Sequence, residues 1–211
     1  MTTIVSPEAA GAPTRFVSGG FLLVLSGPSG AGKGTLVDHL VRLRPDCIFS
    51  ISSTTRPKRD AETESMHYRF VSPEEFERLR RDNYFLEWAE VHGNLYGTPA
   101  VEVDDHVRQG RVVVLDVDVQ GGESVRKARP DAVSVFVHPP SLDALRQRLA
   151  RRGSDVGEVV ERRIANAPGE LAQWVHYDYM IVNYNLEQAA ATLVAIHDAE
   201  RARVGRLRPE S

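Results

Sequence analysis

The most informative segment of this 211-residue chain is a glycine-rich run that ends in a lysine. It reads Leu25-Ser26-Gly27-Pro28-Ser29-Gly30-Ala31-Gly32-Lys33-Gly34-Thr35, follows an apolar stretch and opens a helical pattern. Glycines let successive backbone N–H groups converge on phosphate oxygens, the helix N-terminus adds positive potential, and Lys33 supplies a cation. We expect a phosphate-binding loop, with a plain glycine-rich turn as the alternative. The hydroxyl comes at Thr35, one position later than in the general pattern, so no magnesium-binding hydroxyl is assigned.

A second cationic segment, residues 50–59, reads Ser-Ile-Ser-Ser-Thr-Thr-Arg-Pro-Lys-Arg. The guanidinium groups of Arg56 and Arg59 can hold a phosphate through bidentate bonds, and the phenols of Tyr68 and Tyr96 can add neutral donors. We expect a second anion site here. A solvated basic loop is the alternative, and the phosphate-binding loop elsewhere in the chain weighs against it.

A carboxylate in an aromatic setting follows in the segment Asn83–Thr98, where Glu87 stands between Leu86 and Trp88. Guanine presents adjacent N1–H and N2–H donors, whereas adenine has an acceptor at N1. A buried carboxylate would therefore select guanine. On its own, Glu87 can equally be an ordinary strand glutamate.

Two further charged groups have types that suit phosphoryl transfer. Asp116 and Asp118 end an apolar strand pattern, where a parallel sheet delivers ligand-binding groups, although they can also be simple solubilising residues. Arginines concentrate in residues 145–153 and 161–164, around a helix, turn and helix pattern. Arginines on a closing lid can neutralise the charge that develops during phosphoryl transfer and exclude water.

The elements that must position these residues follow an alternating pattern. Short apolar runs predict buried strands at Phe21–Leu25, Ile48–Ser52, Val112–Val117, Val133–Val137 and Tyr179–Val182. Helical patterns cover Thr35–Arg44, Ala100–Gln109, Ser141–Arg152 and Leu186–Val204. This alternation predicts an α/β fold with a five-stranded parallel sheet flanked by helices.

Three segments fall outside that alternation. Residues 1–19 contain little apolar periodicity and are expected to form a flexible tail. About 60 residues separate the second and third strands, which is too long for a simple connection and predicts a small inserted subdomain. In it, Ser72-Pro73-Glu74-Glu75 predicts a capped helix start. Pro168-Gly169 predicts a kink in, or the end of, the helix after Arg163.

Composition limits the function further. The chain is 42% hydrophobic and 26% charged, with a formal charge of -3, which argues against a broad nucleic-acid-binding surface. No apolar run approaches the roughly 20 residues needed to span a bilayer, and the first residues lack a secretory pattern. Cys47 is the single cysteine, so neither an internal disulfide nor a cysteine-rich zinc site is expected. We expect a cytoplasmic protein with no obligate protein partner.

Six motifs in order carry a resemblance to a known family. They are Gly-Pro-Ser-Gly-x-Gly-Lys-Gly-Thr, Ser-x-Ser-Ser-Thr-Thr-Arg-x-x-Arg, Phe-Leu-Glu-Trp-Ala, His-Gly-Asn-x-Tyr-Gly-Thr, Asp-x-Asp-x-Gln-Gly and Arg-Arg-Gly-x-Asp. Over roughly residues 20–200 the sequence resembles guanylate kinase, a nucleoside monophosphate kinase of the P-loop superfamily. The resemblance implies Mg²⁺-dependent transfer of the ATP γ-phosphate to GMP, and also to dGMP, in purine nucleotide metabolism.

The resemblance also implies a division of the chain and roles for its residues. It implies a P-loop kinase core (20–52, 100–139 and 171–205), a GMP-binding insertion (53–99) and a helical lid (140–170). Lys33, Arg59, Arg152 and Arg163 would be catalytic. ATP would contact residues 27–35, Arg148 and Asn183. GMP phosphate would lie on Arg56, Arg59, Tyr68 and Tyr96, and guanine on Ser52, Glu87 and Thr98. Asp116 and Asp118 would serve GMP or the magnesium region, with Asp116 the candidate for water on the metal.

Some positions depart from the family pattern and keep two alternatives open. The loop at residues 62–67 and Pro99 after Thr98 are unusual, so an acceptor other than GMP is one alternative. Tyr184 after Asn183 is also unusual and is left without a role. A non-catalytic scaffold that binds phosphorylated peptides is the other. Such scaffolds typically lose the phosphate-binding loop, which this chain retains.

Overall fold

The computed structural model describes residues 15–58, 63, 68–91, 93–151 and 157–210. Arg59, Arg152, most of the loop at 62–67 and residues 1–14 of the expected tail therefore lie outside the described residues. The side chains of residues 151 and 157–160 are also not described.

Three sheets organise the strands. The five-stranded sheet has the order β10-β9-β2-β8-β3, and all its neighbouring strands are parallel. A four-stranded sheet has the order β5-β4-β7-β6, and β1 pairs with β11 antiparallel. The strands are β1 (Phe16–Ser18), β2 (Phe21–Ser26), β3 (Cys47–Phe49), β4 (Ser53–Thr54), β5 (Arg69–Phe70), β6 (Phe85–Val91), β7 (Asn94–Pro99), β8 (Val112–Asp116), β9 (Val133–His138), β10 (Tyr179–Val182) and β11 (Leu207–Pro209).

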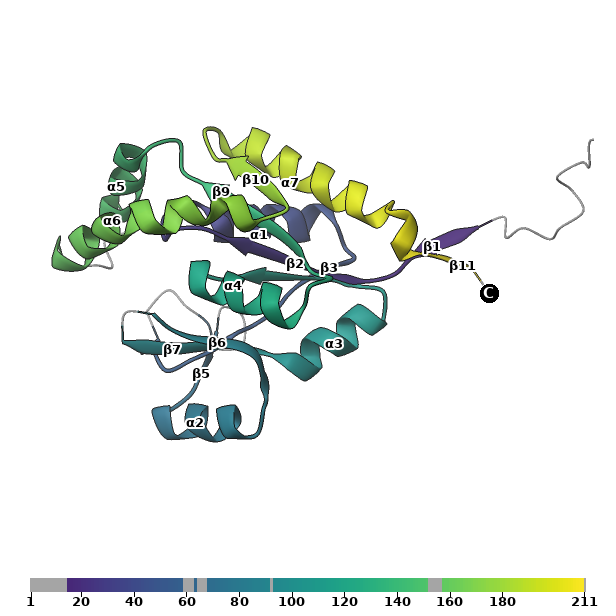
Figure 1. Cartoon of the computed structure of the whole chain (residues 1–211), viewed down its shortest axis with the longest axis horizontal. Helices are drawn as coiled ribbons and strands as arrows, with labels where there is room; N and C mark the ends of the chain where they lie inside the picture. The colour runs from purple at the N-terminus through teal and green to yellow at the C-terminus, as the bar shows by residue number, and fades with distance from the viewer. Residues whose placement is uncertain (1–14, 59–62, 64–67, 92, 152–156, 211) are drawn as a thin grey trace, which may run out of the picture.

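Helices cover both faces of the five-stranded sheet. The helices of the described residues are α1 (Lys33–Leu43), α2 (Pro73–Arg81), α3 (Ala100–Arg108), α4 (Val119–Ala128), α5 (Leu142–Arg151), α6 (Gly157–Leu171) and α7 (Leu186–Arg201). Short 3₁₀ helices span Ala172–His176 and Val204–Arg206. Figure 1 shows α1 and α7 on one side of the sheet and α3 and α4 on the other.

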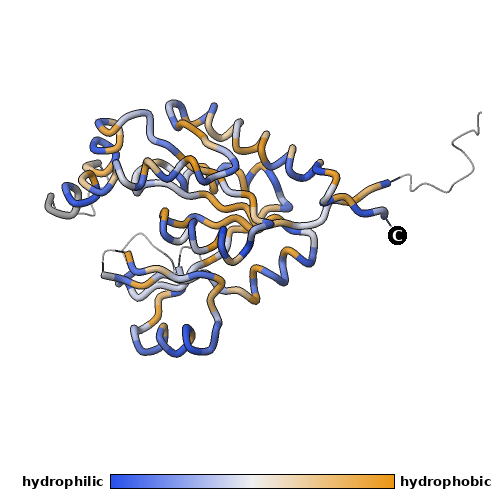
Figure 2. The backbone as a smooth tube through the Cα atoms, in the orientation of Figure 1, coloured by the Kyte–Doolittle hydropathy of each residue, from blue (hydrophilic) through white to orange (hydrophobic). Residues whose placement is uncertain are grey.

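The core follows from the period-two alternation of the central strand. Phe21, Leu23 and Leu25 pack with α1 and α7, whereas Leu22 and Val24 pack with Val103 of α3 and Val125 of α4. Because β2 is buried on both faces, it is apolar along its whole length. Figure 2 shows this apolar centre with hydrophilic turns on the outer sides of the helices.

The second sheet is built from the long segment between β3 and α3. The helix α2 begins where the sequence predicts, with Ser72 as N-cap accepting the backbone N–H of Glu75 at 3.2 Å. Phe76 of α2 is fully buried and stacks on Phe85 of β6, with ring centroids 4.5 Å apart. This aromatic contact packs the helix against the four-stranded sheet.

Several expected boundaries shift in the structure. Phe16–Ser18, assigned to the tail, form β1, because their backbone pairs with Leu207–Pro209. The second strand ends at Phe49 rather than Ser52, because the chain turns into the second sheet at Ser53. The last helix ends at Arg201, short of Val204.

Two helices differ more strongly from the expectations. The helix α4 is not predicted at all, because Gly121 and Gly122 resemble a turn. Its N-cap Asp118 accepts the backbone N–H of Gly121 at 2.8 Å. The helix α6 does not end at Pro168-Gly169 and runs to Leu171. Ala167, fully buried with Leu145 and Leu149, packs this part of α6 against α5.

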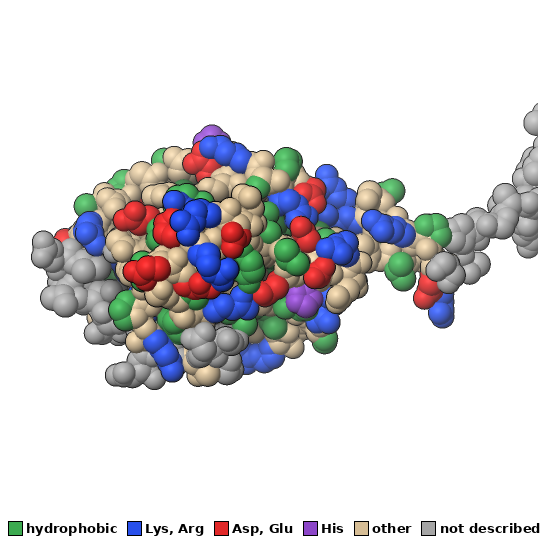
Figure 3. Space-filling view, turned by 90° about the horizontal axis from the view of Figure 1, so that it is seen from below, with side chains coloured by type: hydrophobic (Ala, Val, Ile, Leu, Met, Phe, Trp, Pro, Cys, Tyr) green, Lys and Arg blue, Asp and Glu red, His purple; other side chains and the backbone are tan. Residues whose placement is uncertain are grey.

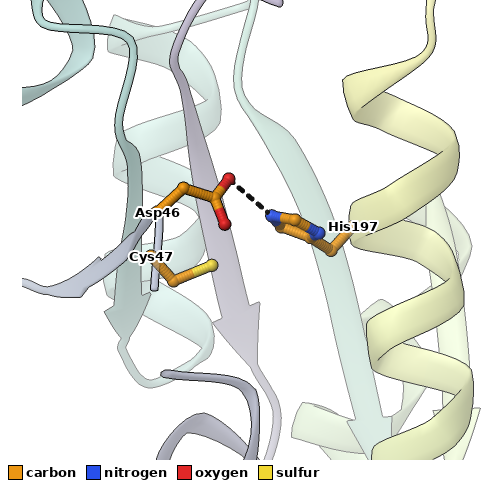
Figure 4. A group of neighbouring side chains, drawn as sticks. All are labelled: Asp46, Cys47 and His197. Atoms are coloured by element: carbon orange, nitrogen blue, oxygen red, sulfur yellow. Dashed lines mark hydrogen bonds and ion pairs between the residues drawn. The ribbon is translucent and has the colours of Figure 1, made fainter. Parts of the chain in front are cut away.

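A charge network joins the amino end of β3 to α7. Figure 4 shows His197 with Nε2 toward Asp46, 3.2 Å from Oδ2, and Cys47 beside them. The Nδ1 atom of His197 lies 2.9 Å from Asp198 Oδ1. Arg201 Nε lies 3.3 Å from Asp46, and Arg44 Nε donates to Asp198 at 2.8 Å. Both imidazole nitrogens and both carboxylates therefore have partners within the protein.

Charges of both signs mix on the described surface. In the face shown in Figure 3, cationic and acidic side chains lie interspersed. Ion pairs such as Arg78 with Glu75 and Arg129 with Asp104 account for part of this mixing. None of the helices formed by the described residues has the length and apolar character needed to cross a bilayer.

The Asp198 network has a pH signature. The hydrogen bond from Arg44 lowers the pKa of Asp198 to about 2. Its stabilisation is therefore fully present above the unfolded pKa of 3.8 and is lost as pH falls through 2. Because this pair is partly exposed, we expect Asp198→Asn to lower Tm by only about 2 °C at pH 7.

Thermal unfolding of Asp198→Asn between pH 7 and pH 2.5 checks this expectation. The difference from wild type should shrink below pH 4. Asp105→Asn, which removes an exposed pair with Arg108 on α3, is the matched control and should change Tm less. A Tm difference for Asp198→Asn that stays constant with pH would contradict the assignment.

Candidate active site

The glycine-rich loop lies between the end of β2 and the start of α1, at the carboxyl edge of the parallel sheet. Gly27 has φ +136°, and a Cβ there would lie 2.4 Å from the carbonyl oxygen of Val137 in β9. Only glycine lets the loop leave β2 this close to the neighbouring strand. The loop is therefore set directly on the sheet and opens the N-terminus of α1 toward any bound anion.

The carbonyl oxygen of Ala31 accepts two hydrogen bonds from other elements. Asn183, which follows β10, donates Nδ2 at 2.9 Å, and Arg148 of α5 donates Nη1 at 3.2 Å. Arg148 also donates Nη2 to the carbonyl oxygen of Asn183 at 2.9 Å. These two predicted ATP-binding residues thus hold the loop backbone, and neither lines the cleft described below.

Lys33 lies at the first position of α1 with its ammonium group turned back over the loop. Its Nζ atom donates to the carbonyl oxygens of Gly27 at 2.8 Å and Pro28 at 3.4 Å, and lies 3.7 Å from Asp116 Oδ1. The ammonium is therefore held by the carbonyl groups of the loop and by an acid at the end of β8. Phosphate oxygens bound at the loop would meet this cation directly.

A polar chain runs across the second sheet at Glu87. Glu87 of β6 pairs in register with Thr98 of β7, whose Oγ1 donates to Glu87 Oε1 at 2.6 Å. Ser52 Oγ lies 3.5 Å from Thr98 Oγ1. A Cβ on Gly121 would lie 3.1 Å from Glu87 Oε2. Because glycine has no side chain, Gly121 leaves room for the carboxylate of Glu87.

Burial changes the acidity of Glu87. The residue is 7% exposed. This desolvation, together with the charge of Asp118, raises its pKa to about 7, although the bonds from Thr98 act in the opposite direction. A carboxylate with this pKa gains or loses its charge near neutral pH, and donors from a ligand would favour the charged form.

Two tyrosines and an arginine lie near this carboxylate in the same cleft. The rings of Tyr68 and Tyr96 meet edge to face with centroids 5.8 Å apart, and the guanidinium carbon of Arg56 lies 5.4 Å from the centre of the Tyr68 ring. The backbone N–H of Arg56 donates to Thr54 Oγ1 at 3.1 Å. A guanidinium group and two phenols in one place suit an anion such as a phosphate monoester.

One predicted lid arginine contacts the loop. Arg163 of α6 donates Nη1 to Ser29 Oγ at 2.9 Å. The hydroxyl of Ser26 donates to the carbonyl oxygen of Asp118 at 2.8 Å and fixes the start of α4 against β2. The loop, the lid helix and the acids after β8 are thus in contact around Lys33.

These groups share one cleft of about 550 Å³ between the two sheets. The predicted residues that line it are Ser29, Gly30, Gly32, Lys33, Gly34, Ser52, Arg56, Tyr68, Glu87, Tyr96, Asp116, Asp118 and Arg163. Gly27, Pro28, Ala31, Thr35, Thr98, Arg148 and Asn183 are described but do not line it. Arg59 and Arg152 lie outside the described residues.

The sequence analysis does not identify several residues that line the cleft. Phe49 and Asp38 line the cleft, as do Ala89, Val91, Val117 and Gly121. Asp38 lies on α1 four residues after Gly34, which also lines the cleft, and Ala89 and Val91 lie at alternate positions from Glu87 along β6. The periodicity of helix and strand could have found these three. The role of Gly121 depends on α4, which the sequence analysis does not predict.

The cleft offers oxygen ligands suited to a hard cation. Asp116 lies beside Lys33 and the start of α1, where a Cβ on Gly34 would be 3.5 Å from Asp116 Oδ2. Carboxylate oxygen and retained water are the ligands that Mg²⁺ prefers, so these residues fit a magnesium ion carried by nucleotide phosphates.

Another group of side chains has the composition of a metal site. Asp46, Cys47 and His197 have donor atoms within 4.8 Å of one another. They lie at the amino end of β3, away from the cleft. Asp46 and His197 already belong to the ion-pair network described above. Burial raises the pKa of Cys47 to about 12, which disfavours the thiolate that a metal requires. We therefore interpret this group as structural.

Comparison with known proteins gives a consistent result. Residues 20–200 match the family model described as guanylate kinase. The guanylate kinase of Symbiobacterium thermophilum is 51% identical over 187 residues, covering 89% of each chain. That of Rhizobium etli is 45% identical over 196 residues, covering 92% of this chain and 89% of the relative. The crystal structure of guanylate kinase from Anaplasma phagocytophilum superposes with a TM-score of 0.76 at 34% identity, covering 92% of both chains.

The loop geometry predicts an unequal cost for two glycine substitutions. Gly32 has φ +98°, and a Cβ there would lie 2.4 Å from Asn183 Nδ2. Gly93 has φ +80° with open space around it. We expect Gly93→Ala to lower the free energy of unfolding by about 1 kcal/mol, through backbone strain alone. Gly32→Ala should cost about 2 kcal/mol or more, because Asn183 must also leave the Ala31 carbonyl.

Urea unfolding of both variants measures the difference. Equal losses in the two variants would contradict the close approach of Asn183 to the loop.

Proposed function

The chain belongs to the guanylate kinase family, and on that basis we propose how its cleft transfers the terminal phosphoryl group of ATP to GMP, giving ADP and GDP. The observation that carries the proposal is that Lys33 and Glu87 line the same cleft. Lys33 belongs to a phosphate-binding loop, and Glu87 is a buried carboxylate with the polarity to accept guanine donors. Donor and acceptor nucleotides can thus meet between the two sheets.

The donor side is proposed to hold the ATP phosphates. Backbone N–H groups of the loop and the N-terminus of α1 face the phosphates, and Lys33 exchanges its carbonyl partners for phosphate oxygens. Pro28 has no N–H, and the N–H of Ala31 donates within the loop to the Pro28 carbonyl at 3.1 Å. Arg148 and Asn183 act by holding the Ala31 carbonyl, which keeps the loop in its open curve. This positioning replaces covalent chemistry, because phosphoryl transfer depends mainly on geometry and charge stabilisation.

The acceptor side is proposed to read the base and the phosphate of GMP separately. Glu87 accepts from guanine N1–H and N2–H, while Thr98 and Ser52 orient it. Arg56, Tyr68 and Tyr96, together with Arg59, hold the phosphate. Because these residues address base and phosphate rather than the sugar, dGMP is also proposed as a substrate.

Arginines are proposed to neutralise the charge that develops on the transferred group. Arg163 already reaches the loop at Ser29, and Arg59 and Arg152 are assigned the same role by the match to the family motifs. Movement of residues 140–170 as a lid would bring them over the phosphates and exclude water.

The proposal also covers the use of magnesium and the cellular location of the protein. Magnesium, when bound to the nucleotide phosphates, supplies charge neutralisation between the reacting oxygens. Asp116, and to a lesser extent Asp118, are the residues proposed to hold its water shell. A cytoplasmic location is proposed from the single buried thiol of Cys47, which suits a reducing compartment.

A direct assay tests the function. ADP formation from ATP and Mg²⁺ should depend strongly on GMP and be clear with dGMP. It should be about 10³-fold lower or less with AMP, because the adenine N1 acceptor would face Glu87. UMP and a reaction without acceptor complete the panel.

The Lys33→Ala variant is the negative control and should lose turnover while remaining folded. If ADP forms only with a nucleoside monophosphate other than GMP, the assignment of the acceptor residues is wrong. If the wild type forms no ADP with any acceptor, a non-catalytic binding module is favoured.

The raised pKa of Glu87 gives a second test. At pH 6 most of this carboxyl group is protonated in the free protein, so KM for GMP should fall as pH rises from 6 to 8. The Glu87→Gln variant should bind GMP poorly at every pH and lack this titration. Because the GMP phosphate titrates equally with both proteins, the variant isolates the contribution of Glu87.

Stability should change in the opposite sense. The folded pKa of Glu87 lies above its unfolded value of 4.5, so its contribution is fully present below pH 4.5 and is lost as pH rises through about 7. Glu87→Gln should therefore raise Tm relative to wild type at pH 8, and less so at pH 5. Unchanged GMP kinetics in this variant would remove Glu87 from guanine recognition.

A further inference from the structure

A tyrosine that precedes β10 packs against α4 and has no role so far. Tyr177 follows the short 3₁₀ helix Ala172–His176. The next residue, Asp178, joins this part of the chain to the sheet. Its backbone N–H donates to the carbonyl oxygen of Ser134 in β9 at 3.1 Å, and its Oδ2 atom accepts the backbone N–H of Ser134 at 2.8 Å. The backbone at Tyr177 is therefore held against β9.

The side chain of Tyr177 lies over one face of α4. Its ring meets Phe136 of β9 edge to face with centroids 5.1 Å apart, and the guanidinium carbon of Arg126 in α4 lies 4.1 Å from its centre. A Cβ on Gly122 would lie 2.6 Å from the Tyr177 hydroxyl oxygen and 2.8 Å from Ser26 Oγ. Because Gly122 and Arg126 are four residues apart, they share this face of the helix. The tyrosine therefore limits where α4 can lie.

The ring, rather than the hydroxyl group, carries this contact. Among the described residues, the Tyr177 hydroxyl is buried without a hydrogen-bond partner, and so is Arg126 Nη1. Unpaired buried polar atoms are unfavourable. The contact is favourable through the buried area of the ring and through the cation over its face.

The same turn of α4 borders the acceptor side of the cleft. Gly121, the neighbour of Gly122, would place a Cβ 3.1 Å from Glu87 Oε2. Asp118 caps the helix through the backbone N–H of Gly121 at 2.8 Å and lines the cleft together with Glu87. Figure 1 shows α4 between the two sheets, and the helix contacts both β2 and β6. A displacement of this turn would therefore change the burial of Glu87.

We propose that Tyr177 is a positioning residue for the acceptor nucleotide, which acts through α4. Its ring holds the first turn of α4 against β2, and this turn closes the cleft beside Glu87. The donor side is held separately, by Arg148 and Asn183 at the Ala31 carbonyl. The inference rests on the proposed function for the identity of the acceptor, but its effect on Glu87 does not.

Loss of the ring should separate the two substrates. In Tyr177→Leu we expect KM for GMP to rise about tenfold, while KM for ATP and kcat at saturating GMP stay within threefold of wild type. Tyr177→Phe keeps the ring and should retain the wild-type KM for GMP. Its Tm should equal or exceed that of wild type, because an unpaired buried hydroxyl is removed. A merely structural role would lower Tm without separating KM for GMP from KM for ATP.

Two further variants complete the kinetic test. Trp174→Leu removes an aromatic side chain that is 46% exposed on the preceding 3₁₀ helix, and it should behave as wild type. Arg126→Ala leaves the tyrosine in place but frees one face of its ring, so KM for GMP should rise about threefold. If Tyr177→Leu does not fold, Arg126→Ala decides alone. A KM for GMP within twofold of wild type in the folded variants, or an equal rise in Tyr177→Phe, overturns the proposal.

Titration of the Glu87 carboxyl group by NMR distinguishes the two proposals, because it needs no turnover. Burial raises the pKa of Glu87 to about 7 in the folded protein. A looser α4 admits water, so this pKa should fall toward 4.5 in Tyr177→Leu and, by less, in Arg126→Ala. If wild type has no GMP-dependent turnover, the proposed function fails, but a lower pKa of Glu87 in these variants still supports the inference. An unchanged or higher pKa contradicts it.

Discussion

The two hydrogen bonds to the Ala31 carbonyl are the contact on which the site depends most. One donor, Asn183, follows an edge strand of the sheet, and the other, Arg148, belongs to α5. Three separate parts of the chain therefore meet at a single backbone oxygen of the loop. The curve of the loop is set by these neighbours, by the close approach of Gly27 to β9, and by the bonds from Lys33 Nζ back to the loop carbonyls. Within the loop, the N–H of Ala31 donates to the Pro28 carbonyl at 3.1 Å.

Two sheets with different roles contribute residues to the cleft. The parallel sheet supplies the loop, Lys33 and Asp116 from the carboxyl ends of its strands, where α/β folds commonly bind ligands. The four-stranded sheet supplies Glu87 and Tyr96. The helix α4 lies between them, with Asp118 capping it and Gly121 leaving room for Glu87 Oε2. The first turn of one short helix thus lies between the residues that the two sheets bring to the cleft.

Much of this arrangement could be predicted from the sequence, because its signals are local. A lysine after a glycine-rich run, apolar stretches buried on both faces, and the Ser72 cap each follow from neighbouring residues. The helix α4 could not be found, because its stabilising cap at Asp118 overrides the poor helix propensity of Gly121 and Gly122. The continuation of α6 past Pro168 likewise depends on the burial of Ala167 against α5, a contact distant in sequence. Motif matching found most of the polar cleft residues but passed over Asp38 and the apolar Phe49 and Val91.

The order of strands in the central sheet has a consequence for synthesis on the ribosome. β2 emerges early, but its partners β8 and β9 begin at residues 112 and 133, and β1 waits for Leu207–Pro209. The apolar face of β2 that α1 and α7 share is only partly covered until residues 186–201 have left the exit tunnel. Apolar strands with unpaired edges are prone to aggregate. The nascent chain is therefore most dependent on chaperones in the interval before its last helix emerges, and the phosphate-binding loop gains its bonds from Arg148 and Asn183 only once these residues have emerged.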